Sequence, residues 1–414
     1  MSYTIFDIEI TEPLCDLHAA GDDEGVAILL RRKGVPIAFW MEELGSRRAL
    51  RSDALADEIA RRAGEEILAE AIREELGRPF APPQLPLLSV AICTRDGSER
   101  VARLLDSLGK TLPTVAEPNG SLDIIVVDNA PSDDRTHTLV DEWGGARYVL
   151  EPRPGLNFAR NRAIAEARGA LLAFLDDDVV VDRHWRRGLA EAVGENPDAV
   201  AFTGLVLPLE LATRAQVIFE QRGGFRRGFE KIRYGARLPG NPLYPAGAGI
   251  FGAGANMAFR TDVLRELGGF DEALDTGGPV PGGGDLDIFY RIIRAGRPIV
   301  YEPRFLAFHE HRRELAELRR QYRRSWGLGF MVFVTKCLRA DPERRLQLLA
   351  FIAWWFRWEL FELGRSIAGC HPIRGSDPIP PAMILGELYG GIVGLLGGYG
   401  RSRRRVARIR RSLP

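Results

Sequence analysis

The sequence predicts an α/β fold with three parts: a small N-terminal α/β module, a central α/β domain and a C-terminal amphipathic helical region. Between residues 88 and 176, short apolar stretches alternate with amphipathic helices, which is typical of parallel βαβ units. The stretch PFAPPQLP, residues 79–86, has the composition of a linker and cannot continue a helix. After residue 339, apolar and aromatic runs are interrupted by charges. We therefore expect units over residues 1–80, 87–338 and 339–414.

Length and composition indicate a folded protein without a strong net charge. The chain has 414 residues, enough for two to three domains. Its 56 basic and 56 acidic residues cancel, so we expect no nucleic-acid partner. The four cysteines form no CxxC pair, which argues against a zinc site or a disulfide framework. Acidic residues near the N-terminus argue against an export signal, and we expect a cytoplasmic location.

The N-terminal module is predicted from three apolar stretches and one long helix. Residues 5–10, 26–30 and 35–40 read as strands, and residues 52–76 as a charged helix. Apolar residues recur along that helix at helical spacing: Leu55, Ile59, Ala63, Ile67, Ala71 and Leu76.

The central domain is predicted to begin with four parallel strands. These strands span residues 88–93, 124–127, 148–150 and 171–175, and the helices between them span residues 99–108, 136–143 and 158–168. In such sheets, ligands bind beyond the carboxyl ends of the strands. The loops after Cys93, Val127 and Leu175 are therefore expected to converge on one crevice.

Three adjacent carboxylates, Asp176, Asp177 and Asp178, end the fourth strand. Carboxylates this close repel one another, and a divalent cation relieves that repulsion. Mg²⁺ and Mn²⁺ prefer oxygen ligands and commonly combine one or two protein carboxylates with phosphate oxygens and water. The run therefore favours a site for Mg²⁺ or Mn²⁺ and a nucleoside diphosphate. An acidic surface turn that caps the helix starting near Trp185 is the alternative interpretation.

Other polar residues are expected at the same edge of the sheet. Asp128 ends the second strand and can accept hydrogen bonds from a base or a ribose, although this segment also fits an ordinary β-to-α connection. Thr94 and Arg95 follow the first strand and can meet a nucleotide. Neither GxGxxG nor GxxxxGK[ST] occurs there, which argues against a dinucleotide-binding site and against a P-loop nucleotide site.

Two arginines near the start of the third helix, Arg160 and Arg162, can face a diphosphate, because helix N-termini favour anions. Each of them fits a solvated helix face equally well. His309 and His311 alternate along a strand and so share one face. His309 is a candidate to supplement the aspartates as a metal ligand, and a structural histidine is the alternative.

A long Gly/Pro loop before residue 284 delivers Asp285 and Asp287 to the first turn of a helix. Such a loop can move over a ligand. A carboxylate placed there can act as a general base and accept the proton of an acceptor hydroxyl. Alternatively, Asp285 serves only as the N-cap of this helix, and the glycines only lengthen the loop.

The C-terminal region contains two apolar runs, residues 351–363 and 383–398, followed by a basic tail. Charged residues within the runs keep them below the roughly 20 apolar residues of a membrane span. Interfacial helices beside a polybasic segment are expected, in contact with the cytoplasmic face of the cell membrane. Helices that simply pack on the domain are the alternative.

Taken together and in this order, the motifs resemble those of the family 2 glycosyltransferases, inverting enzymes with a GT-A nucleotide-binding fold, over residues 87–338. The resemblance implies that Asp176–Asp178 is the family's DxD metal motif and Asp128 its nucleoside-binding aspartate. GGGDLD resembles the acidic base motif, which usually reads Glu-Asp. Here Gly284 stands in place of the Glu, and Asp285 matches the Asp.

The resemblance implies transfer of a sugar from a nucleoside-diphosphate sugar to a glycan or lipid-linked acceptor, in cell-envelope, exopolysaccharide or glycolipid synthesis. Asp285 is expected to act as the base, while Asp178 with help from Asp176 holds the cation on the leaving diphosphate. The N-terminal module resembles an extra module found on some bacterial relatives. Two alternatives remain: a sugar nucleotidyltransferase, and a catalytically silent subunit of a glycan-assembly complex.

Overall fold

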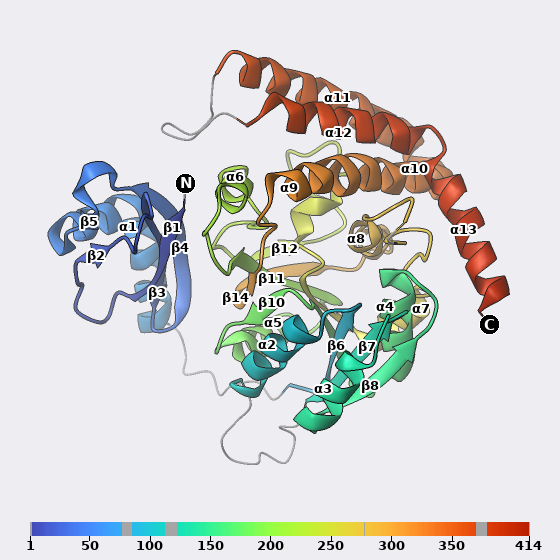
Figure 1. The fold of residues 1–414 in the computed structure, drawn as a ribbon, viewed down its shortest axis with the longest axis horizontal. Helices are drawn as coiled ribbons and strands as arrows, with labels where there is room; N and C mark the ends of the chain where they lie inside the picture. The colour runs from blue at the N-terminus through green and yellow to red at the C-terminus, as the bar shows by residue number, and fades with distance from the viewer. Residues whose placement is uncertain (1, 77–84, 112–121, 277, 370–378, 414) are drawn as a thin grey trace.

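The computed structural model describes residues 2–76, 85–111, 122–276, 278–369 and 379–413. A small sheet with one long helix, a large central sheet and a layer of C-terminal helices follow one another along the chain (Figure 1). The predicted α/β class is confirmed. The boundary at residue 80 lies outside the described residues, and so does most of the predicted linker.

The N-terminal module is a three-stranded sheet covered by one helix. Strand β1 (Tyr3–Glu9) lies parallel to β3 (Gly25–Arg32), which pairs antiparallel with β4 (Val35–Glu43). Helix α1 (Ser52–Leu76) buries Leu55, Ile59 and Ala63, three of the residues predicted from its apolar spacing. Two short strands, β2 (Leu17–His18) and β5 (Ala49–Leu50), form a separate pair.

Buried charges fix this module to the central domain. Arg31 is 2% exposed and forms ion pairs with Asp7 at 2.6 Å and with Asp182 of the central domain at 2.7 Å. Tyr3 also donates a backbone hydrogen bond to the carbonyl oxygen of Leu211. The module is therefore docked against the domain.

The central sheet has nine strands, and its first half is the predicted set of parallel βαβ units. Their strands are β6 (Leu88–Thr94), β7 (Asp123–Asn129), β8 (Ala146–Glu151) and β9 (Leu171–Asp176). Their helices are α2 (Ser98–Gly109), α3 (Arg135–Trp143) and α4 (Leu156–Glu166). Each observed element overlaps its predicted range and differs from it at either end by at most two residues.

The second half makes the sheet mixed. Its strands are β10 (Val179–Val181), β11 (Ala201–Pro208), β12 (Ile232–Tyr234), β13 (Asn256–Arg260) and β14 (Ile299–His309). Strand β13 lies antiparallel between β9 and β11, in the order β10-β14-β11-β13-β9-β6-β7-β8, and β12 pairs with β14. The helices of this half are α5 (Trp185–Glu195), α6 (Arg214–Gln221), α7 (Thr261–Glu266) and α8 (Gly284–Arg294).

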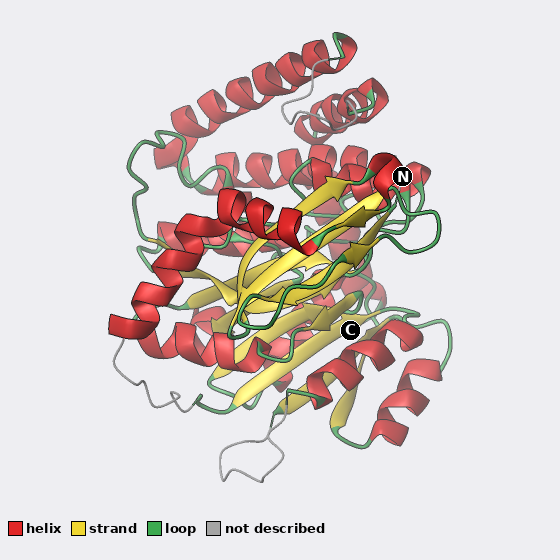
Figure 2. Cartoon of the chain, turned by 90° about the vertical axis from the view of Figure 1, so that its left-hand side faces the viewer, coloured by secondary structure: helices red, strands yellow, loops and turns green. Residues whose placement is uncertain are grey.

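Helices lie on both sides of the sheet (Figure 2). Along β6, Val90 and Ile92 pack into one core, while Ala91 and Cys93 pack into the other. Because both faces are covered, this strand reads as a continuous apolar run.

A continuous helical rod leads into the C-terminal region. It consists of α9 (Leu315–Gln321), a π-helical segment (Tyr322–Gly329) and α10 (Phe330–Ala340). The apolar residues of α10 from Met331 to Val334 are buried within the domain. Helices α11 (Arg345–Ile367) and α12 (Pro381–Leu395) lie along one side of the rod, and α13 (Gly398–Ser412) turns away from them (Figure 1).

Candidate functional site

Strand register brings the predicted loops to one edge of the sheet. Thr94 of β6 lies opposite Asp128 of β7, and the adjacent Cys93 lies opposite Asp176 of β9. The loop after β7 is tied to the loop after β6, since Ser132 donates two hydrogen bonds to the carboxylate of Asp96. The predicted convergence is therefore present in the structure.

Asp177 is bound by the neighbouring strand and helix. Thr94 Oγ1 donates a hydrogen bond to Asp177 Oδ2 over 2.6 Å, and Arg100 Nη2 lies 3.1 Å from the same oxygen. Arg95 is 57% exposed and lies 3.7 Å from Asp96. Thr94 and Asp177, two of the predicted nucleotide contacts, therefore bond to each other. Arg95, the third, is largely exposed to solvent.

Asp178 begins a chain of ionisable groups that leads away from the crevice. Asp178 Oδ1 lies 3.3 Å from His309 Nε2, and His309 Nδ1 lies 2.9 Å from His311 Nδ1. His311 Nε2 then meets Glu220 Oε1 at 2.8 Å. Both histidines therefore lie together, as their alternation predicts, and Glu220 is a member that the sequence analysis missed.

Asp178 and His309 shift each other's pKa in opposite directions. Burial by itself raises the pKa of Asp178, but the His309 charge outweighs it and holds that pKa well below the usual range. Burial likewise lowers the pKa of His309, but the Asp178 carboxylate outweighs it and the net shift is upward. Each group thus favours the charged form of the other, and a cation bound at His309 Nε2 would take the place of the proton on that nitrogen.

The donor atoms near Asp178 fit part of a divalent cation's coordination shell. Asp178 Oδ1 is buried without a hydrogen bond, at 3.3 Å from His309 Nε2. Ligands at about 2.1 Å in octahedral geometry lie about 3 Å from their neighbours, so these two atoms suit adjacent positions. In the part of the chain that the structure describes, no cluster of three or more His, Cys, Asp or Glu residues is placed to hold a metal ion. Further ligands would have to come from a bound diphosphate and water.

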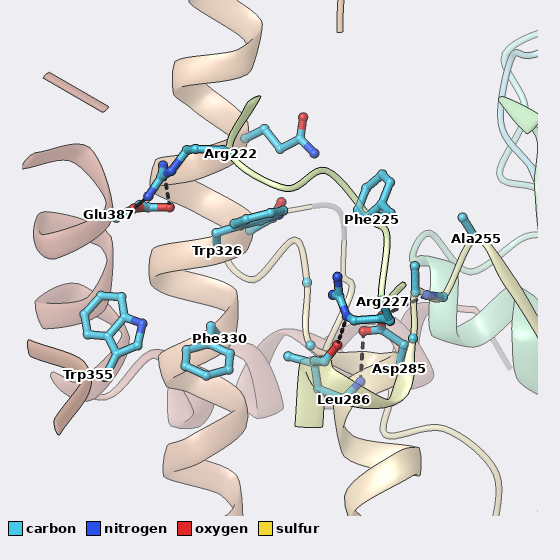
Figure 3. A pocket seen from close by; sticks show the side chains of 18 of the residues that line it. Arg222, Phe225, Arg227, Ala255, Asp285, Leu286, Trp326, Phe330, Trp355 and Glu387 are labelled. Atoms are coloured by element: carbon cyan, nitrogen blue, oxygen red, sulfur yellow. Dashed lines mark hydrogen bonds and ion pairs between the residues drawn. The ribbon is translucent and has the colours of Figure 1, made fainter. Parts of the chain in front are cut away.

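A cavity of about 710 Å³ opens beside this edge. Asp285 lines one end of it and accepts hydrogen bonds from the backbone N–H groups of Gly254 at 3.1 Å and Leu286 at 2.9 Å (Figure 3). Gly283 is the N-cap of α8, so the alternative of Asp285 as the N-cap is wrong. Asp176 also lines the cavity.

Asp287, the other acidic residue of this turn, is fully buried and does not line the cavity. Its carboxylate pairs with Arg291 at 2.8 Å and with Lys336. Asp285 is therefore the acidic residue of the pair that faces the cavity.

Asp275 supplies a carboxylate next to Asp285. It has a left-handed backbone conformation (φ 49°) and accepts a hydrogen bond from the Gly284 N–H at 2.8 Å. Burial raises the pKa of Asp275 to about 6, with Asp285 adding to the shift and Arg160 opposing it. The sequence analysis missed Asp275, and its only signal was an acidic residue within the Gly-rich loop.

The two arginines of α4 face different ways. Arg160 is 4% exposed and lies 3.6 Å from Asp176 and 3.4 Å from Asp275, and it also lines the cavity. Arg162 is 44% exposed and pairs with Glu166 at 2.9 Å. Arg160 therefore balances the carboxylates of the cavity, and Arg162 lies on the outer face of the helix.

Arg227 is a further cation that lines the cavity, and the sequence analysis missed it. Its guanidinium donates to the carbonyl oxygens of Gly249 at 2.6 Å and Arg226 at 2.8 Å. No ion pair with a carboxylate is present for it among the described residues. A charged guanidinium without a counter-ion, near Asp285, is suited to bind a phosphate group.

Asp128 is fully buried at the end of β7 and has a free acceptor. Its Oδ2 accepts a hydrogen bond from the Tyr148 hydroxyl at 3.2 Å, and its Oδ1 has no partner. Burial raises the pKa of Asp128 to about 6 against the opposing effect of Tyr148. The unpartnered oxygen is suited to an N–H or O–H donor of a ligand.

The chain is similar to known glycosyltransferases. Residues 89–268 match the family model described as glycosyl transferase family 2. A pre-mycofactocin glycosyltransferase of Mycobacterium tuberculosis is 27% identical over 266 residues, which cover 61% of this chain and 50% of that protein. A glucosyl-dolichyl phosphate glucuronosyltransferase of Haloferax volcanii is 26% identical over 196 residues, which cover 44% of this chain and 56% of that protein. The chain therefore spans about half the length of these relatives.

Among solved structures, the chain is similar to a mannosyltransferase from Pyrobaculum calidifontis in complex with GDP-Man and Mn²⁺. The identity is 19% and the TM-score is 0.46, with 86% of this chain and 94% of that chain covered.

Proposed function

Because the chain carries a glycosyltransferase family 2 domain over residues 89–268, we propose that it transfers a sugar from a nucleoside-diphosphate sugar to an acceptor hydroxyl, with inversion at the anomeric carbon. The observation that carries this proposal is the cavity beside the carboxyl edge of the sheet that both Asp285 and Asp176 line. The acceptor class is a glycan or a lipid-linked glycan, in cell-envelope, exopolysaccharide or glycolipid synthesis.

Asp285 is the proposed base. Two backbone N–H groups bind its carboxylate and fix its direction toward the cavity. The acceptor oxygen attacks the anomeric carbon while Asp285 takes its proton, and the bond from that carbon to the diphosphate breaks on the opposite face. General base catalysis of this kind contributes roughly 10² to 10⁴ in rate.

The donor is proposed to lie along the sheet edge. Asp128 offers its unpartnered oxygen to the nucleoside, and Arg227 is placed to bind the diphosphate. Asp178 and His309, with Asp176 beside them, would hold Mg²⁺ or Mn²⁺. The cation supplies charge neutralisation for the leaving diphosphate.

The C-terminal helices support a peripheral contact with the cytoplasmic face of a membrane. Helices α11 and α12 expose ten large apolar side chains: Leu346, Leu349, Trp354, Trp358, Leu360, Phe361, Ile367, Leu385, Tyr389 and Ile392. The next helix, α13, contains seven arginines. Such pairing of apolar and basic surfaces favours anionic lipid.

These helices also pack inward. Leu348, Phe351, Trp355 and Met383 are buried against the domain, so the alternative of packing helices holds for their inner faces. No described helix is by itself long and apolar enough to span a membrane, although α12 and α13 pass the same test as a pair bent by 65°.

Product analysis tests the proposed function. The full chain is incubated with a panel of nucleotide sugars and Mn²⁺, with and without glycan acceptors. Release of a nucleoside diphosphate supports a transferase, whereas release of pyrophosphate indicates a sugar nucleotidyltransferase. Release of neither product, together with absence of Mn²⁺-dependent nucleotide binding, indicates a silent subunit.

A further inference from the structure

The cavity continues beyond Asp285 into a part that the C-terminal helices build (Figure 3). We call this part the outer chamber. It is lined by the π-helical segment, α10, α11, α12 and the end of α6, through Gln221, Arg222, Trp326, Phe330, Trp355, Trp358, Glu359, Glu362, Arg365 and Glu387. Most of these residues lie outside the segment matched by the family model, residues 89–268.

Aromatic rings form the apolar walls of the outer chamber. Trp326 and Phe330 come from the rod, while Trp355 and Trp358 come from α11. Figure 3 shows Trp326 between the Arg222–Glu387 pair and Asp285, with Phe330 below Trp326 and Trp355 on the side away from Asp285. Aromatic walls with a few polar groups are typical of sites for small organic ligands.

The cations of the outer chamber are already paired. Arg222 Nη2 lies 2.8 Å from Glu387 Oε2, and its guanidinium stacks over Tyr322. Arg365 lies 3.0 Å from Glu362. An anionic ligand would therefore meet carboxylates and no free cation among the described residues of this chamber, which disfavours phosphates and carboxylates.

Two buried oxygen atoms of the outer chamber, one on Glu359 and one on Gln221, lack hydrogen-bond partners. Glu359 is 6% exposed, and its Oε2 makes no hydrogen bond, as is also true of Gln221 Oε1. Burial, followed by the neighbouring Glu387, raises the pKa of Glu359 to about 9, so its carboxyl is neutral at pH 7. The Glu359 carboxyl hydrogen-bonds Glu387, which leaves Oε2 free to accept a hydrogen bond from a ligand hydroxyl. Leaving such groups unpaired is costly, and a ligand can satisfy them.

We propose that the outer chamber is the acceptor site and that it binds an uncharged sugar ring, stacked on the tryptophans and hydrogen-bonded by Glu359 and Gln221. The proposal rests on the proposed function, because it is the base Asp285 that requires an acceptor in the same cavity. It assigns acceptor choice to the C-terminal helices and excludes a phosphate group from the chamber itself.

The test uses octyl glycosides, below their micelle concentration, as probes of the full chain. A panel of octyl glucoside, galactoside, mannoside and N-acetylglucosaminide is compared with octyl phosphate. Binding is followed by tryptophan fluorescence and by calorimetry, because three of the tryptophans line the chamber. We expect saturable binding of at least one glycoside and, in an Arg227→Gln background that lacks the proposed phosphate-binding cation, at least tenfold weaker binding of octyl phosphate.

Three variants separate cavity binding from adsorption of the octyl chain. Glu359→Leu is expected to weaken glycoside binding about tenfold, since one hydrogen-bonding group is lost. Glu359→Gln keeps a neutral polar group and is expected to bind within about threefold of the parent chain. Leu346→Ala is the matched control on the same helix, because Leu346 is 84% exposed and does not line the cavity.

Three results would overturn the proposal. They are binding of octyl phosphate to the Arg227→Gln chain as tight as that of every glycoside, absence of saturable binding across the panel, and equal weakening by Glu359→Leu and Leu346→Ala. If Glu359→Leu does not fold, Gln221→Met takes its place with the same expectation.

Failure of this inference is distinguishable from failure of the proposed function. A thermal-shift series with UDP or GDP and Mn²⁺ reports on the donor end, since a bound ligand stabilises according to its concentration over its dissociation constant. Nucleotide binding without glycoside binding overturns the acceptor site alone. Glycoside binding without nucleotide binding or turnover overturns the proposed transferase and leaves a carbohydrate-binding chamber.

Discussion

Asp275 Oδ2 accepts a hydrogen bond from the Gly284 N–H at 2.8 Å, and a Cβ atom at position 284 would lie 2.2 Å from that same oxygen. The family's usual glutamate would therefore require the side chains of Asp275 and Asn157 to move. A carboxylate is nevertheless present beside Asp285, because Asp275 reaches the space from the preceding loop. The Asp275 carboxylate thus occupies space that is available because residue 284 is a glycine.

Adding a side chain at position 284 is expected to harm the protein. Gly284→Ala should destabilise it by about 1–3 kcal/mol, because the new Cβ collides with Asp275 and with Asn157. Gly284→Glu should also lower transfer and not restore it. Thermal melts and turnover measure these effects, with Gly364→Ala as a control whose Cβ meets nothing within 4 Å. Faster transfer by Gly284→Glu would contradict the packing argument.

Substitutions of the two acidic residues of α8 are expected to have different effects, one on turnover and the other on stability. Asp285→Asn should lower turnover by about 10² to 10⁴ while Mn²⁺-dependent nucleotide binding stays within about twofold. Asp287→Asn should mainly lower stability, since it strips a buried carboxylate from Arg291 and Lys336. Steady-state kinetics and melting curves on both variants check this division. Undiminished turnover of Asp285→Asn would refute its assignment as the base.

Removal of the proposed cation ligands is expected to weaken donor binding. Asp178→Ala and His309→Ala should each weaken Mn²⁺-dependent nucleotide binding about 10- to 100-fold. Asp134→Ala removes the same charge from an exposed position and should leave binding unchanged. Calorimetric titrations of nucleoside diphosphate at varied Mn²⁺ measure the effect. An unaltered Mn²⁺ dependence in Asp178→Ala would count against this ligand.

Stability is expected to fall as pH rises through the titration range of Glu359. The folded-state pKa is raised to about 9 by burial and by Glu387, with Glu362 adding and Arg222 opposing. The folded protein therefore holds a proton that the unfolded chain releases near its ordinary carboxyl pKa, and this favourable term is lost as pH rises toward 9.

Glu359→Gln has no such proton to lose. Its melting temperature relative to the parent chain should therefore increase steadily between pH 5 and pH 9. Thermal melts across that range provide the check, and a difference that stays constant with pH would show that Glu359 does not titrate in this way.

Membrane contact is expected to depend on the exposed face of α11. Leu360→Ser with Phe361→Ser should weaken binding to anionic vesicles about tenfold or more, because both side chains are more than half exposed. Leu68→Ser, on the exposed side of α1, is the control. Co-sedimentation with phosphatidylglycerol vesicles at two salt concentrations measures this. Equal binding by all three proteins would exclude the α11 face as the contact.

Local patterns in the sequence determined much of the fold. The alternation of apolar strands with amphipathic helices predicted β6 to β9 and α2 to α4, because burial on one or both faces leaves a periodic signal in neighbouring residues. The same logic placed Asp128 and Asp176 at the carboxyl edge. Helix geometry would also have separated Asp285 from Asp287, since residues two apart on a helix point about 200° from each other.

Only the tertiary structure decided which partner each polar side chain meets. Asp176, Asp177 and Asp178 are adjacent in sequence but face Arg160, Thr94 and His309, which come from three different elements. Asp275 and Arg227 enter the cavity from loops without a periodic signal, and α11 closes a cavity that begins at β9. The reason is physical: secondary structure follows from contacts between near neighbours, whereas a site depends on distances between segments that the chain brings together only when it packs.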